Sequence, residues 1–125
     1  MVQWAAALIV YAGLAGAAGV ALAAAGAHGN DLSTLTPPAY FLIIHAAAAT
    51  AIVAVATRAA HPGAFLLAGL VLLIGVSLFS GDIALRTFTG NRLFPMAAPT
   101  GGTTMILGWL LLAASGIWEV LTNRG

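Results

Sequence analysis

The sequence contains no cysteine, no lysine and very few charged residues of any kind. Without cysteine, neither disulfides nor thiolate metal sites can form. Charged residues make up 6% of the 125 residues, whereas an ordinary soluble domain carries about 25%. A net charge of +1 is too small to neutralise the many phosphates of a nucleic acid. We therefore expect neither a soluble surface nor a nucleic-acid partner.

Recognisable catalytic and cofactor motifs are also absent. The spacing of His28, Asp31, His45 and Asp82 matches no common pattern of metal ligands. Helices rich in alanine and glycine leave little room for a haem between His28 and His45. Ser80 is followed by glycine but no strand precedes it, so it is not a nucleophile elbow. We predict no cofactor, no metal and no enzyme activity.

Long apolar runs are what the sequence does contain, because 62% of its residues are hydrophobic. About 20 apolar residues in a helix span a bilayer core. The runs that meet this length cover roughly residues 4–26, 38–57, 63–86 and 101–121. They are continuous rather than alternating, which favours helices over the strands of a membrane barrel. The predicted fold is all-α and integral to the membrane: one domain, 1–125, with four antiparallel transmembrane helices in an up-down bundle.

The first run is read as a helix of the mature protein rather than a secretory signal. No basic residue precedes it, and it is longer than the apolar core of a usual signal peptide. Gly13, Ala17 and Ala21 form a row of small residues at four-residue spacing. Such rows let helix backbones approach closely in lipid. The row favours packing inside the bundle over the alternative, a seam between copies in a homo-oligomer.

Prolines and threonines suggest where two of the helices begin. Thr36 precedes two prolines, as an N-cap precedes proline in a first turn. Thr100 follows Pro99 and is predicted to cap the fourth helix. The alternative for the segment from Pro95 is a loop that re-enters the bundle end, which lipid tolerates only where protein or a wet cavity surrounds the backbone.

The antiparallel order brings most polar side chains to one end of the bundle. These residues are His28, Asp31, His45, Ser80, Asp82, Arg86, Thr100, Thr103 and Thr104. The other end has Arg58, His61, Glu119 and Arg124. Ionisable residues within membrane segments usually mark function. The candidates for a ligand or proton site are therefore His28, His45, Ser80, Asp82, Arg86 and Thr100.

The Asp82–Arg86 pair and His45 each allow a structural and a functional interpretation. Asp82 and Arg86 are four residues apart with the acid first, the favourable order for a helical ion pair. They either neutralise each other or form a proton or cation site. His45 either bonds a carbonyl or hydroxyl within the core or pairs with Asp82 across the bundle, where the couple could relay protons.

Charge counting leaves the orientation nearly undecided. Arg58 and Arg124 lie on the side of the termini, and Arg86 and Arg92 on the other. Because Asp82 offsets Arg86, the positive-inside rule weakly favours cytoplasmic termini.

Several motifs resemble one family of small bacterial membrane proteins, domain of unknown function 423. They are Gly26-Ala27-His28-Gly29, His45, Leu78-Phe79-Ser80-Gly81, Pro99-Thr100-Gly101-Gly102 and Gly108-Trp109. The resemblance implies four transmembrane helices in the bacterial inner membrane, cytoplasmic termini, and relatives among small eukaryotic membrane proteins. It implies no reaction.

The chain departs from this family pattern at two places. Many members have serine, leucine and tyrosine at the positions of Asp82, Ile83 and Ala84, and many have a tyrosine at the position of Phe41, which Tyr40 precedes here. We expect a non-enzymatic scaffold or accessory subunit that binds a protein, lipid or small ligand at its polar end, as a homo-oligomer or with a membrane-protein partner. The alternative is a small proton-linked transporter or permease that uses His45, Asp82 and Arg86.

Overall fold

The computed structural model describes residues 2–123, so Arg124 lies outside the described residues. The helices are α1 (Val2–His28), the short 3-10 helix η1 (Ser33–Leu35), α2 (Thr36–Ala56), α3 (Pro62–Thr89) and α4 (Ala97–Thr122). The described residues contain no strand. Four helical segments are long and apolar enough to cross a membrane, the second including η1. The all-helical prediction with four membrane-length helices is confirmed.

Two predicted helix starts are wrong in detail. Thr36 is the first residue of α2 and not its N-cap, because η1 leads directly into the helix and Leu35 takes the cap position. The fourth helix begins at Ala97 rather than at 101. Pro99 is accommodated in its first turn, where the missing N–H has no partner to lose. Thr100 lies inside the helix and donates its backbone N–H to Met96 O at 2.9 Å.

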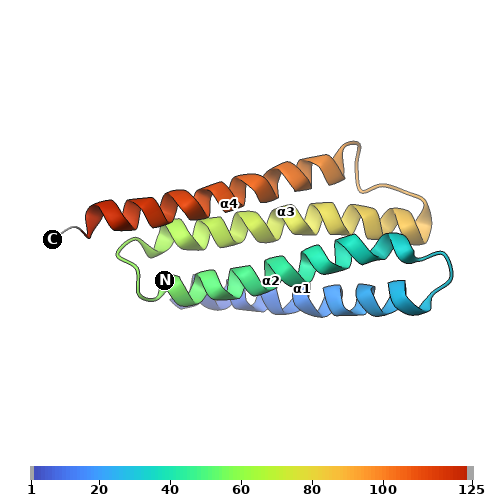
Figure 1. The fold of residues 1–125 in the computed structure, drawn as a ribbon, viewed down its shortest axis with the longest axis horizontal. Coiled ribbons are helices and arrows are strands. Elements are labelled where there is room, and N and C mark those ends of the chain that lie inside the picture. The colour runs from blue at the N-terminus through green and yellow to red at the C-terminus, as the bar shows by residue number, and fades with distance from the viewer. Residues whose placement is uncertain (1, 124–125) are drawn as a thin grey trace.

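The chain crosses the length of the molecule four times (Figure 1). The connections α1–α2 and α3–α4 lie at one end, here called the two-loop end. The α2–α3 connection lies at the other end, together with the start of α1 and the end of α4. Gly90, with φ +77°, terminates α3 in the left-handed conformation that glycine adopts easily.

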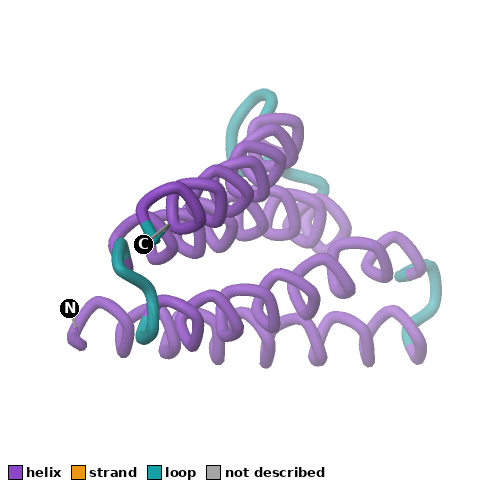
Figure 2. Tube along the Cα trace, turned by 60° about the vertical axis from the view of Figure 1, so that its left-hand side comes forward, coloured by secondary structure: helices purple, strands orange, loops and turns teal. Residues whose placement is uncertain are grey.

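The four helices do not form a closed ring. Helices α1, α2 and α3 contact one another, whereas α4 packs along α3. Within residues 2–123, the Cα atoms of α1 and α4 stay more than 8 Å apart. Figure 2 shows α4 on the far side of α3 from α1 and the α3–α4 loop projecting from the two-loop end. One long side of α4 therefore carries few contacts.

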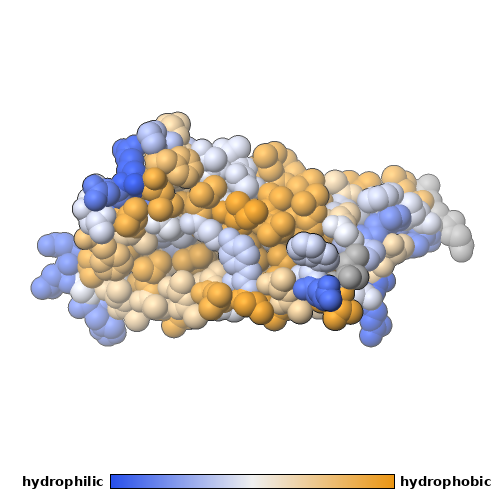
Figure 3. Space-filling view, turned by 180° about the vertical axis from the view of Figure 1, so that it is seen from behind, coloured by the Kyte–Doolittle hydropathy of each residue, from blue (hydrophilic) through white to orange (hydrophobic). Residues whose placement is uncertain are grey.

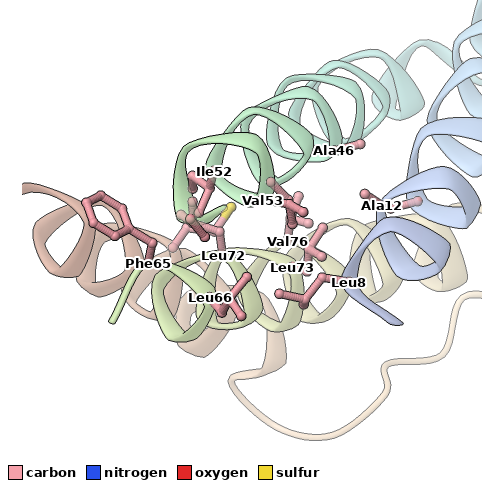
Figure 4. Close-up of a cluster of buried hydrophobic side chains, with 14 of the residues drawn as sticks. Leu8, Ala12, Ala46, Ile52, Val53, Phe65, Leu66, Leu72, Leu73 and Val76 are labelled. Carbon is pink, nitrogen blue, oxygen red and sulfur yellow. The ribbon is translucent and has the colours of Figure 1, made fainter. Parts of the chain in front are cut away.

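The apolar core lies where α1, α2 and α3 meet (Figure 4). Leu72, Leu73 and Val76 of α3 are fully buried at its centre. Leu8 of α1 and Ile52 of α2 pack against them. Dispersion between such close-packed side chains is what holds helices together when both partners are already surrounded by hydrocarbon.

Glycines fit α4 tightly against α3. A Cβ on Gly75 would lie 2.7 Å from Met105 N, and one on Gly101 would lie 2.6 Å from Gly75 O and would overlap the Phe79 backbone. Gly108 faces Leu72 in the same way. In α1, Gly19 faces Ile43 of α2, whereas Gly13 has no neighbour within 4 Å. Glycine packing thus serves contacts inside this chain, while Gly13 faces outward.

The surface is hydrophobic over its middle. Figure 3 shows orange side chains across the central part of this face and blue side chains gathered toward the ends. Large exposed residues such as Leu14, Ile44 and Leu110 belong to this surface. An apolar waist between polar ends matches the thickness profile of a bilayer.

Candidate functional site

Asp82 is the charged residue buried most deeply in the two-loop end. Its side chain is 3% exposed. One carboxylate oxygen, Oδ1, accepts a hydrogen bond from the Leu93 backbone N–H at 2.9 Å. The other, Oδ2, lies 3.4 Å from Arg86 Nε. The predicted Asp82–Arg86 pair is therefore present, and Asp82 also holds the α3–α4 loop against the last turns of α3.

A groove opens beside this pair, between the end of α3 and the start of α4. Its volume is about 460 Å³. Asp82 lines it together with Phe79, Ile83, Arg86, Arg92, Met96 and Gly102. Arg92 is exposed and, among residues 2–123, has no carboxylate within ion-pair distance. The groove thus contains one carboxylate and two guanidinium groups, with a formal excess of one positive charge.

Ser80 holds two helices together. It is fully buried and donates its hydroxyl hydrogen to Pro38 O at 2.8 Å. The Pro38 carbonyl belongs to the first turn of α2 and can accept this bond in addition to one within the helix, because a carbonyl oxygen has two lone pairs. Nearby, the Thr34 and Thr87 hydroxyls are 2.9 Å apart. Ser80 therefore fastens α2 to α3 at the two-loop end and presents no free hydroxyl there.

His45 is buried, with 3% of its surface exposed, but its partners are not those at the two-loop end. Its Nδ1 lies 2.8 Å from Phe41 O, and its Nε2 accepts a hydrogen bond from Trp109 Nε1 at 3.1 Å. Because one nitrogen must donate and the other accept, His45 is the neutral tautomer with its proton on Nδ1. The alternative pairing of His45 with Asp82 is not found, because both side chains have other partners.

The tautomer of His45 is a testable prediction. We expect ¹⁵N spectra of histidine-labelled protein to show His45 with Nδ1 protonated and Nε2 bare. Trp109→Phe removes the donor to Nε2, and interhelical hydrogen bonds of this kind contribute about 0.6 kcal/mol in membranes. The variant should shift the Nε2 resonance and slightly lower the melting temperature.

Trp4→Phe is the matched control, because Trp4 is 70% exposed. An unchanged His45 spectrum in Trp109→Phe protein would contradict the contact between α2 and α4.

His28 and Thr100 lie at the two-loop end without taking part in the groove. His28 is the last residue of α1, and both side chains are exposed. Neither side chain makes a hydrogen bond with the described part of the chain. Within residues 2–123, no three histidine or carboxylate side chains come together as a metal site would require. The structure therefore brings Asp82 and Arg86 together and leaves His28, His45, Ser80 and Thr100 in separate settings.

Sequence reasoning missed a second polar cluster at the opposite end. The Glu119 carboxylate accepts hydrogen bonds from the backbone N–H groups of Ala60 and His61. His61 stacks on Trp118 with ring centroids 3.8 Å apart, and its Nδ1 lies 3.5 Å from Glu119 Oε2. The sequence placed His61 and Glu119 at the same end of the bundle but gave no reason to expect contact between them. The cluster ties the end of α4 to the α2–α3 loop.

Trp109 was also missed as a partner. Tryptophan is typical of membrane interfaces, yet Trp109 lies near the middle of α4. Trp109 is 41% exposed, but an indole N–H in an apolar run has no water to bond and needs an acceptor, and this requirement was the available signal. Tyr11 similarly reaches from α1 to α3, where its hydroxyl lies 2.6 Å from Ser77 Oγ and donates to Leu73 O at 3.1 Å.

Comparison with known families shows where this chain belongs. A family model described as protein of unknown function (DUF423) matches residues 22–102. The matched stretch contains every candidate site residue and Arg92, whereas Trp109 lies outside it. No solved structure matches this chain.

Proposed function

Because the chain belongs to the DUF423 family of proteins of unknown function, we propose a role for it from its geometry. It is a bacterial inner-membrane protein of four antiparallel spans with both termini in the cytoplasm. It acts as a non-enzymatic scaffold or accessory subunit. Its binding site for a lipid, small ligand or partner protein lies at the two-loop end.

The groove beside Asp82 is the observation that carries this proposal. The middle of the molecule is covered by apolar side chains. At the two-loop end, Asp82 fixes Arg86 and the loop, so Arg86 and Arg92 stand beside the same hollow. Concave sites with a few well-placed polar groups are where ligands bind. A site of this form suits binding and contains no paired acid and base for catalysis.

The geometry favours the binding role over the proton-linked transporter. A relay through His45 and Asp82 would need the two groups to exchange a proton directly or through water. In the structure, both nitrogens of His45 are engaged with Phe41 and Trp109, and Asp82 is engaged with Leu93 and Arg86. Proton flux into proteoliposomes that Asp82→Asn abolishes would restore the transporter hypothesis.

The membrane topology can be tested with single cysteines, since the chain has none of its own. We expect Asn30→Cys and Asn91→Cys to react with an impermeant maleimide from the periplasmic side of intact spheroplasts. Ala60→Cys should react only after the membrane is opened. All three positions are exposed in connections between helices, so labelling reports sidedness rather than burial. Labelling of positions 30 and 91 from opposite sides would overturn the four-span arrangement.

The binding role is tested by what the protein retains after mild solubilisation. Native mass spectrometry should show a bound lipid, a second copy or another protein. The complex with that species should weaken when Arg86 and Arg92 are both replaced by glutamine. A bare monomer under every mild condition would contradict the proposal.

A further inference from the structure

We propose that the groove formed by Arg86 and Arg92 binds the phosphate of an anionic phospholipid. This inference rests on the proposed function and specifies the ligand of the same site. It follows from three features of the groove: its charge, its depth in the bilayer and its apolar wall.

The positive charge of the groove comes from two guanidinium groups whose terminal N–H donors are available to a ligand. Asp82 faces Arg86 through Nε at 3.4 Å, and no hydrogen bond to the terminal nitrogens of Arg86 exists within residues 2–123. The Arg86 side chain is 38% exposed. Arg92 is exposed on the loop that Asp82 holds. Guanidinium groups are suited to phosphate because their planar donors match two phosphate oxygens at once.

The first turn of α4 adds to this field. Ala97, Ala98 and Pro99 line the same groove, so the positive end of the α4 dipole lies beside it. One carboxylate, Asp82, also lines the groove. One of its oxygens accepts the Leu93 N–H, and the other lies 3.4 Å from Arg86 Nε, at ion-pair distance without a hydrogen bond. An anion therefore meets one neutralised pair, one further guanidinium and a helix N-terminus.

The length of α3 sets the depth of the site. A helix of 28 residues is about 42 Å long, which exceeds the roughly 30 Å of a hydrocarbon core. Arg86 lies in the last turn of α3. The excess length places this turn in the headgroup region, where lipid phosphates lie. Basic pockets between membrane helices are known to bind anionic headgroups.

The apolar wall distinguishes a lipid from free phosphate. Phe79 and Ile83 are one turn apart on α3 and line the groove with Met96. Gly102 leaves space on the α4 side, since a Cβ there would meet nothing within 4 Å. A free phosphate ion has no apolar part that could pack against this surface. An acyl chain can lie along it while its phosphate contacts the arginines.

The test compares lipids that differ only in headgroup. Detergent-purified protein is titrated with phosphatidylglycerol or with phosphatidylcholine of the same acyl chains, and bound lipid is counted by native mass spectrometry. We expect phosphatidylglycerol to bind more tightly. Each basic residue near a membrane surface contributes about fivefold in affinity. Arg92→Gln should therefore lower the affinity for phosphatidylglycerol about fivefold and leave the affinity for phosphatidylcholine unchanged.

Arg58→Gln is the matched control. It removes the same charge from an exposed position in the α2–α3 connection, at the other end of the molecule. Equal losses in Arg58→Gln and Arg92→Gln would overturn the site, because general surface charge would then explain the binding. Gly102→Leu should also lower the affinity for phosphatidylglycerol, because the added side chain fills the groove without changing its charge. Undiminished binding in this variant would contradict the proposed position of the acyl chain.

The remaining outcomes separate this inference from the proposed function. Inorganic phosphate at millimolar concentration should not displace the lipid, and full displacement would assign the groove to a free anion. If the two lipids bind equally while the cysteine labels place both loops on one side, the lipid inference fails alone. If the two loops are labelled from opposite sides of the membrane, the proposed function is contradicted, and the lipid inference that rests on it is contradicted with it.

Discussion

Gly101→Ala is expected to lower the free energy of unfolding by about 3 kcal/mol, at the upper end of the usual cost of overpacking. The added Cβ would lie 2.6 Å from Gly75 O and would overlap the backbone of Phe79. Backbone atoms cannot rotate away as a flexible side chain can, so α4 must move off α3. Unfolding in mixed micelles at increasing SDS, followed by circular dichroism, measures the change.

Gly102→Ala is the matched control for this prediction. It makes the same substitution at the next position of the same helix, and its Cβ would meet nothing within 4 Å. Alanine is the better helix former by roughly 1 kcal/mol in soluble hosts, so this variant should be unchanged or slightly more stable. Equal stability of the two variants would show that α3 and α4 do not approach as closely as the structure places them.

The helices were predictable because lipid imposes a simple rule on the sequence. Every backbone group must be satisfied within the membrane, so uninterrupted apolar runs of this length become helices. Their ends were less predictable. The fourth helix begins at Ala97 because Met96 adopts φ +68° and turns the chain. A left-handed non-glycine residue of this kind has no reliable sequence signature.

Packing between the helices was only partly predictable. The small residues of α1 indicated close contacts, but Gly13 of the predicted row has no neighbour within 4 Å, and the α1 glycine that faces α2 is Gly19. They did not show that the tightest seam joins α3 and α4 through Gly75, Gly101 and Gly108. Glycine spacing indicates that a helix can approach another helix closely. Which helix it approaches depends on complementary side chains, such as Leu72 on the other helix.

The candidate site was predicted correctly for local pairs and poorly for distant ones. Asp82 and Arg86 share a helix, so their spacing was sufficient to predict contact. His45 was considered as a partner of Asp82, but it bonds Trp109 instead. Contacts between helices depend on rotation and depth, which one sequence does not specify. Arg92 lies beside the groove because the hydrogen bond from Leu93 N–H to Asp82 holds the loop there, and one sequence does not predict that bond.

Asp82→Ala is expected to lower the free energy of unfolding by about 2 kcal/mol, the usual size of a lost hydrogen bond to a charged group. The variant removes the acceptor of the Leu93 N–H and the partner of Arg86 together. The α3–α4 loop should then detach from α3. Tryptic cleavage after Arg92 in the folded protein, which reports loop release directly, should become faster.

Asp82→Asn separates the two roles of the carboxylate. Its amide oxygen still accepts from Leu93 N–H, whereas the ion pair is lost. Because Arg86 is 38% exposed, the pair itself should contribute at most about 1 kcal/mol. We therefore expect Asp82→Asn to keep slow tryptic cleavage and most of the stability. Asp31→Asn, which removes the same charge from an exposed loop position, should match the unmodified chain. If Asp82→Asn released the loop as fully as Asp82→Ala, the charge of Asp82 rather than its acceptor oxygen would be what holds Arg92 beside the groove.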